Sequence, residues 1–91
     1  MANDDLCWLS AVELARAIKR KKVSPVEVMD AVLARIARLD PTLHAYCTLT
    51  AETARRQARA AERAIMRKGA RPGPLHGVPF SIKDMLMTKG V

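Results

Sequence analysis

Aromatic residues are nearly missing from this chain of 91 residues, which has one Trp, one Tyr and one Phe. So few rings cannot form the stacking platforms on which proteins hold successive bases of a single strand. The two cysteines, Cys7 and Cys47, are too few for a disulfide framework and lack the spacing of a structural zinc site. No apolar run approaches the ~18 residues of a membrane-spanning helix. We therefore expect two reduced thiols, no metal and no membrane partner.

The first residues of the chain, 1–5, are acidic and not apolar, which is not the pattern of a secretory signal. With no membrane span expected either, we predict a cytoplasmic location. A length of 91 residues indicates one domain or part of one, and a chain of this size buries only about 60% of its unfolded surface. Because many of its apolar residues are alanines, we expect too small a core for comfortable stability alone.

A first helix is predicted over about residues 11–21. Ser10 and Glu13 have the spacing of a capping box, in which each side chain accepts the backbone N–H of the other residue. Apolar residues follow at helical spacing on one face: Ala11, Leu14, Ala15 and Ile18. The basic run 19–22 suits the end of the helix, where cations complement the helix dipole.

A second helix is predicted over about residues 25–39. Ser24 and Glu27 form another capping box, and a proline occupies the first turn. The apolar stripe consists of Met29, Val32, Leu33, Ile36 and Leu39. Pro41 predicts the end of the helix, because the residue before a proline avoids helical backbone angles. The short linker between the two helices predicts that they pack against one another.

A third helix is predicted over about residues 51–68, with Gly69 as its end. One side carries residues that allow close approach of a neighbouring element: Ala54, Ala58, Ala61 and Ile65. The opposite side carries arginines: Arg55, Arg56, Arg59, Arg63 and Arg67. With a net charge of +7, this arginine face suits either an anionic partner or solvent. We favour solvent, because runs of charge are usually solvated.

Two short strands are predicted, over about residues 45–49 and 78–83. Alternation in the second strand places Val78, Phe80 and Ile82 on one face and Lys83 on the other. One interpretation is that Lys83 ends the strand and reaches into water. The other is that Lys83 lies in apolar surroundings, where desolvation favours the neutral amine and makes it a proton acceptor or a nucleophile.

A few other residues allow specific expectations. Gly77 suits close backbone packing or a positive φ. His76 either lines a pocket or bonds its ring to backbone, and we favour the backbone bond. His44 suits the surface at the start of a strand. Two methionines that follow Lys83 suit a substrate channel or a core equally well: Met85 and Met87.

Residues 75–84 read Leu-His-Gly-Val-Pro-Phe-Ser-Ile-Lys-Asp and residues 88–91 read Thr-Lys-Gly-Val. This pattern resembles the first motif of the amidase signature family, and the Lys-Asp pair with its Gly-Val-Pro lead-in is its most specific part. In that family's strand motif His44 stands where an asparagine is common. Three upstream segments resemble the family's opening helix, second helix and following strand: 9–14, 23–28 and 43–46. The resemblance therefore covers nearly the whole chain.

The resemblance implies an α/β fold, the family's mixed-sheet α/β/α sandwich. Residues 1–91 would supply the N-terminal helices and first strands of that single domain. It also implies amide hydrolysis by a Ser–Ser–Lys triad without metal or organic cofactor. In that triad Lys83 takes a proton from the attacking serine through a bridging serine in a cis peptide. Because Ser10, Ser24 and Ser81 do not match the catalytic serines, we expect the isolated chain to be inactive.

The partners implied by the resemblance are those of a complete enzyme. We expect a small-molecule amide substrate and no nucleic acid. A homodimer and an amidotransferase complex both remain open, since some family members are subunits of tRNA-dependent amidotransferases. The alternative function is a stand-alone basic helical module that binds an anionic partner such as RNA. Salt-sensitive binding to RNA or DNA would distinguish this alternative.

Overall fold

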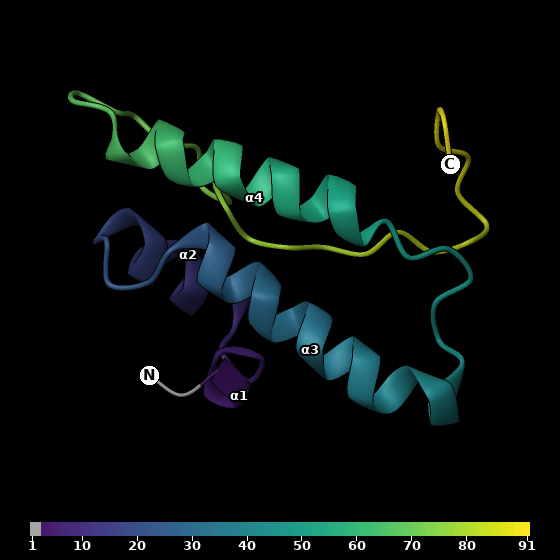
Figure 1. Ribbon diagram of the computed structural model, residues 1–91. Helices are drawn as coiled ribbons and strands as arrows, with labels where there is room; N and C mark the ends of the chain where they lie inside the picture. The colour runs from purple at the N-terminus through teal and green to yellow at the C-terminus, as the bar shows by residue number, and fades with distance from the viewer. Residues whose placement is uncertain (1–2) are drawn as a thin grey trace.

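The computed structural model describes residues 3–91, so Met1 and Ala2 of the acidic start lie outside the described residues. Helices in this range are α1 (Asn3–Leu6), α2 (Ala11–Lys19), α3 (Pro25–Leu43) and α4 (Ala51–Met66). The two long helices, α3 and α4, pack together and run in opposite directions (Figure 1). The short helix α1 packs against α3. After α4 the chain turns back and continues without helix to its C-terminus (Figure 1).

The predicted starts of α2 and α3 are confirmed. The Ser10 hydroxyl accepts the N–H of Glu13 at 3.1 Å, and the Glu13 carboxylate accepts the N–H of Ser10 at 2.9 Å. The hydrogen bond from the Ser10 backbone is the main reason why the pKa of Glu13 is lowered. At α3 the Ser24 hydroxyl accepts the N–H of Val26 at 2.9 Å, while Glu27 accepts the N–H of Ser24 at 3.2 Å.

The predicted end of α3 at residues 40–41 is wrong, because the helix contains Pro41 and continues to Leu43. A proline this close to a helix end removes only one backbone donor. His44 then ends the helix with a left-handed φ of 51°. The Asp40 carboxylate accepts the N–H groups of the next two residues, at 2.7 Å from Ala45 N and 3.2 Å from Tyr46 N. These bonds tie the residues that follow the helix to its last turn.

The remaining helix bounds differ from the expectations by small amounts. The helix α2 ends at Lys19 and α4 at Met66, two residues before each predicted end. The short helix α1 was not predicted at all. A helix of four residues has too few turns for an apolar period to be visible in the sequence.

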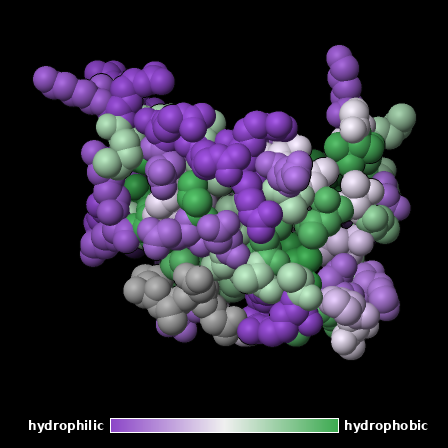
Figure 2. Space-filling view, viewed as in Figure 1, coloured by the Kyte–Doolittle hydropathy of each residue, from purple (hydrophilic) through white to green (hydrophobic). Residues whose placement is uncertain are grey.

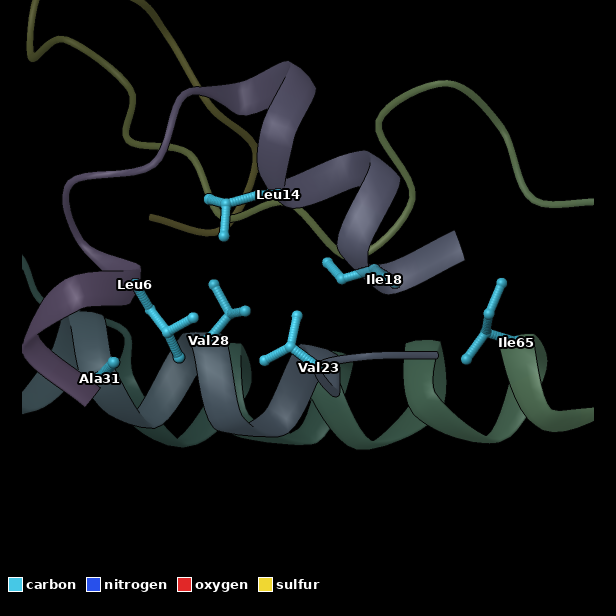
Figure 3. Close-up of a cluster of buried hydrophobic side chains, with 7 residues drawn as sticks. All are labelled: Leu6, Leu14, Ile18, Val23, Val28, Ala31 and Ile65. Atoms are coloured by element: carbon cyan, nitrogen blue, oxygen red, sulfur yellow. The ribbon is translucent and has the colours of Figure 1, made fainter. Parts of the chain in front are cut away.

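A small apolar core lies where the helices meet. It comprises Leu6 of α1, Leu14 and Ile18 of α2, Val23, Val28 and Ala31, and Ile65 of α4. Figure 3 shows Leu14 facing Leu6 and Val28 across this core. Side chains of α2 and α3 share this core, while the main contacts of α3 with other helices are with α4 and α1.

The buried residues of α3 differ from the predicted stripe. They are Pro25, Val28, Ala31 and Leu33, so only Leu33 belongs to both sets. The other predicted residues are half-buried: Met29, Val32, Ile36 and Leu39. The reason is that α3 packs against α1 on one side and against α4 on another. Burial is therefore spread over two faces and does not follow one stripe.

Neither expected strand forms among residues 3–91, and the described chain is helical with irregular connections. The expectations for 45–49 and 78–83 are therefore wrong for this structure, and the predicted α/β class is represented here by its helices alone. A strand needs a neighbouring strand to pair its backbone N–H and C=O groups. The described residues offer no such neighbour to either segment.

Candidate functional site

The segment that leads to Lys83 is fixed to the helices at His76. Its ring Nε2 lies 2.9 Å from the carbonyl oxygen of Ala61 in α4. This contact confirms the interpretation that the His76 ring bonds backbone. The backbone N–H of His76 also donates to the carbonyl of Gly73 at 3.2 Å, which closes a turn just before the motif.

Gly77 shows both features expected of it, a positive φ of +80° and close packing. A Cβ atom added at this position would lie 2.8 Å from Cγ of Pro25 in α3. It would also lie 3.1 Å from Cδ1 of Ile18 in α2. Real Cβ atoms almost never approach a heavy atom within 3.0 Å. The site therefore admits glycine and no larger residue without a shift of its neighbours.

Lys83 itself lies on the surface of the described chain, as do all residues from 80 to 91. Its carbonyl accepts the N–H of Leu86 at 3.0 Å, so a turn begins at the lysine. Within residues 3–91 the structure thus agrees with the interpretation that Lys83 reaches into water. Its catalytic role remains a prediction.

Two of the serines are engaged in helix caps. Ser10 caps α2 and Ser24 caps α3, as the sequence predicts. The Ser24 hydroxyl also donates a hydrogen bond to the carboxylate of Glu62, which links the start of α3 to α4. Ser81 is exposed, two residues before Lys83. The roles of Ser10 and Ser24 in this structure are therefore structural.

Large apolar side chains on both sides of Lys83 in the sequence are exposed. They are Leu75, Phe80, Ile82, Met85, Leu86, Met87 and Val91. Phe80 is 82% exposed and Met87 is 100% exposed. Met85 and Met87 therefore do not fill the core of the described chain. Apolar residues gather around the C-terminal end in the space-filling view (Figure 2). Exposed apolar side chains gathered at one end in this way are typical of a place where other protein or a ligand packs.

Two shallow hollows open elsewhere on the surface, and neither includes Lys83. One, of about 310 Å³, lies between the end of α4 and the following loop, beside Arg67, Arg71 and His76. The other, of about 280 Å³, lies along the C-terminal half of α3, beside Cys7 and Tyr46. The described residues contain no cluster of three or more His, Cys, Asp or Glu side chains that could hold a metal ion. No described helix is both long and apolar enough to cross a membrane.

The arginine face of α4 is exposed, as predicted, and hydrophilic side chains cover this helix in Figure 2. Arg55 Nε lies 3.6 Å from the Asp30 carboxylate of α3. The opposite side packs inward, with Ala58 and Ile65 buried. Solvation of the arginines is therefore confirmed, while RNA binding by this face remains untested.

Comparison with known proteins shows a family and several similar proteins. The model of the amidase family matches residues 27–91, which include the whole segment from His76 to Lys83. The glutamyl-tRNA(Gln) amidotransferase A subunit of Carboxydothermus hydrogenoformans is 44% identical over 87 residues, which cover 96% of this chain and 18% of that protein. The A subunit of the same name from Methylococcus capsulatus is 48% identical over 79 residues, 87% of this chain and 16% of that protein.

An acylamidase of Rhodococcus erythropolis is 35% identical over 91 residues, which cover 100% of this chain and 19% of that protein. The chain thus spans less than a fifth of the length of these relatives. No solved structure matches it.

Proposed function

This chain belongs to the amidase family, and we propose from that premise that it forms the N-terminal portion of an enzyme that hydrolyses a carboxylic amide. The matched region, residues 27–91, contains Lys83 and its Gly-Val-Pro lead-in. That overlap is the observation on which the proposal depends, because Lys83 is the residue that carries chemistry in the motif. The substrate is a small-molecule amide.

In the proposed mechanism Lys83 is the base of a Ser–cisSer–Lys triad. A serine hydroxyl attacks the amide carbonyl carbon, and its proton passes through the bridging serine to the neutral amine of Lys83. The protonated lysine then returns a proton to the leaving nitrogen, and ammonia or an amine departs. Water hydrolyses the acyl-enzyme to release the acid. This is nucleophilic catalysis by a hydroxyl that an adjacent base activates.

The surroundings of Lys83 support the view that other parts of a longer polypeptide complete the site. The lysine is exposed, and the large apolar side chains near it are exposed as well. A lysine becomes a neutral base when desolvated, and such side chains provide the apolar cover once other segments pack on them. Ser10 and Ser24 already cap helices, so residues 1–91 alone should not turn over an amide.

The test uses the longest polypeptide that carries this sequence in its native source, purified with an antibody to residues 1–91. Ammonia release is measured with acetamide, hexanamide and benzamide as probes. We expect activity in the parent, loss of activity in Lys83→Ala, and retention in the control Lys89→Ala. Turnover by residues 1–91 that disappears in Lys83→Ala would contradict the proposal that other parts of a longer polypeptide complete the site. A parent inactive on all three probes and on glutamine would contradict amide hydrolysis.

A second candidate is the amidotransferase form of the same chemistry. It is favoured by the relatives named as A subunits of glutamyl-tRNA(Gln) amidotransferase, which reach 44–48% identity against 35% for the acylamidase. Under this alternative the polypeptide acts within a complex of several chains and takes ammonia from an amide donor. Glutamine as the preferred substrate, together with co-purification of other subunits, would favour the transferase. Hydrolysis of simple amides by a single polypeptide would favour the hydrolase.

A further inference from the structure

We propose that residues 76–78 form an anchor that fixes the register in which the Lys83 segment leaves the helices, and that His76 and Gly77 are positioning residues for Lys83. We call these three residues the 76–78 anchor. The proposal rests on the proposed role of Lys83 in amide hydrolysis. It concerns a different question, namely which contacts decide where that lysine is held.

Three consecutive residues make three different kinds of contact with the helices. His76 Nε2 is hydrogen-bonded to the Ala61 carbonyl of α4. Gly77 lies against α2 and α3, within the space that Ile18 and Pro25 leave for it. Val78 packs against the apolar core, and its N–H donates to the Leu75 carbonyl at 3.1 Å. The anchor therefore contacts three helices within three residues.

These contacts exclude a shift of the chain by one residue. A shift would bring a residue with a Cβ to the place of Gly77, where that atom would lie 2.8 Å from Pro25. It would also require a φ near +80° from a residue with a side chain, which is strained for L-residues. The hydrogen bond of His76 to α4 would be lost in the same shift. Hydrogen bonding, steric fit and burial thus select a single register.

Beyond the anchor only Pro79 is still half-buried, and residues 80–91 are all exposed. From Val78 to Lys83 an extended chain spans at most about 18 Å. Successive side chains of an extended segment point to opposite faces, so a slip of one residue would turn Lys83 to the other face. The register held at residues 76–78 therefore decides which side of the segment presents the amine.

The first test uses residues 1–91 and does not depend on activity. It measures docking, by which we mean the packing of the 76–78 anchor and the residues after it against the helices. A nitroxide is attached to Ser81→Cys in a Cys7→Ser, Cys47→Ser background, and broadening of the Ile18 and Ile65 methyl signals is measured by NMR. His76→Leu removes the donor to Ala61. Loss of a neutral hydrogen bond raises the ratio of undocked to docked molecules about fivefold, which should reduce the broadening.

Two variants serve as matched controls for this measurement. His76→Gln keeps an N–H donor near the position of Nε2 and should restore the broadening seen in the parent. His44→Leu changes the other histidine, which is exposed at the end of α3, and should have no effect. Equal broadening in His76→Leu and the parent would overturn the anchor.

The second test asks whether the anchor acts through Lys83. In the longest native polypeptide, kcat and KM are measured with whichever probe amide gives the highest rate. We expect His76→Leu to lower kcat, by up to about fivefold, with KM unchanged, and His76→Gln to restore kcat. An unchanged kcat with reduced docking would overturn the positioning role. An inactive parent would overturn the proposed function together with that role, while the NMR result would still decide whether residues 76–78 dock.

Discussion

Replacement of Gly77 by alanine tests the close packing of this residue against α2 and α3. The new Cβ would lie 2.8 Å from Cγ and 3.2 Å from Cβ of Pro25, and 3.1 Å from Cδ1 of Ile18. Pro25 is buried in the first turn of α3 and Ile18 lies in the core, so neither side chain can move freely into solvent. Relief of the contact therefore requires residues 76–78 to move away from the helices.

The expected loss in the free energy of unfolding of Gly77→Ala has two separable parts. A left-handed φ with a Cβ present costs about 1–2 kcal/mol. An extra methyl group in a packed site costs about 1–3 kcal/mol more. Gly69→Ala is the matched control, because Gly69 has a similar φ of +76° but no atom within 4 Å of the added Cβ. Gly69→Ala should therefore show the first part alone, and the difference between the two variants should be about 1–3 kcal/mol.

The free energy of unfolding is measured by urea titration followed by far-UV circular dichroism. The melting temperature gives a second measure, at about 4–8 °C per kcal/mol for a domain of this size. Equal destabilisation by Gly77→Ala and Gly69→Ala would refute the steric argument. Pro25→Ala removes the atom nearest the new methyl group. The double variant Pro25→Ala, Gly77→Ala should therefore be more stable than the sum of the single changes predicts.

Three further changes test the fold. Val28 is fully buried, so Val28→Ala should cost roughly 2 kcal/mol in urea titration, whereas Val12→Ala, at a site 63% exposed, should stay within about 0.5 kcal/mol. Ala58 is 6% exposed on α4, so Ala58→Leu should cost about 1–3 kcal/mol by overpacking, while Ala60→Leu, on the exposed side, should unfold like the parent. The pKa of Glu13 is lowered in the folded state, so its capping contribution is present above the ordinary carboxyl pKa and is lost as pH falls through the lowered value. The melting temperature of a Glu13→Gln variant should therefore fall less on acidification than that of the parent. Identical dependence of the two melting temperatures on pH would contradict this role of Glu13.

The elements that the sequence predicts correctly are those that depend on neighbours in the chain. The capping boxes at Ser10 and Ser24 form because the partner carboxylate lies three residues away, whatever else the protein does. The two faces of α4 follow in the same way from helical spacing, with arginines outside and Ala58 inside. For Gly77 the sequence allows either close packing or a positive φ, and the structure shows both.

The incorrect predictions concern partners that lie outside the local sequence. The strand expected at 78–83 has the right residue types but no neighbouring strand among the described residues. The stripe expected on α3 is displaced because α1 and α4 contact that helix from different sides. The helix α3 passes Pro41 and ends at Leu43, and the Asp40 carboxylate accepts N–H groups beyond that end.

The sequence by itself determined where three helices start, which side of α4 meets solvent, and which family the lysine motif resembles, since spacing along the chain is sufficient for each. Only the tertiary structure decided that His76 bonds to α4 and that Gly77 lies against Pro25. Those contacts join residues far apart in the chain, and their geometry depends on how the helices pack. The tertiary structure also places Lys83 beyond the last buried residue, at the surface of the described chain.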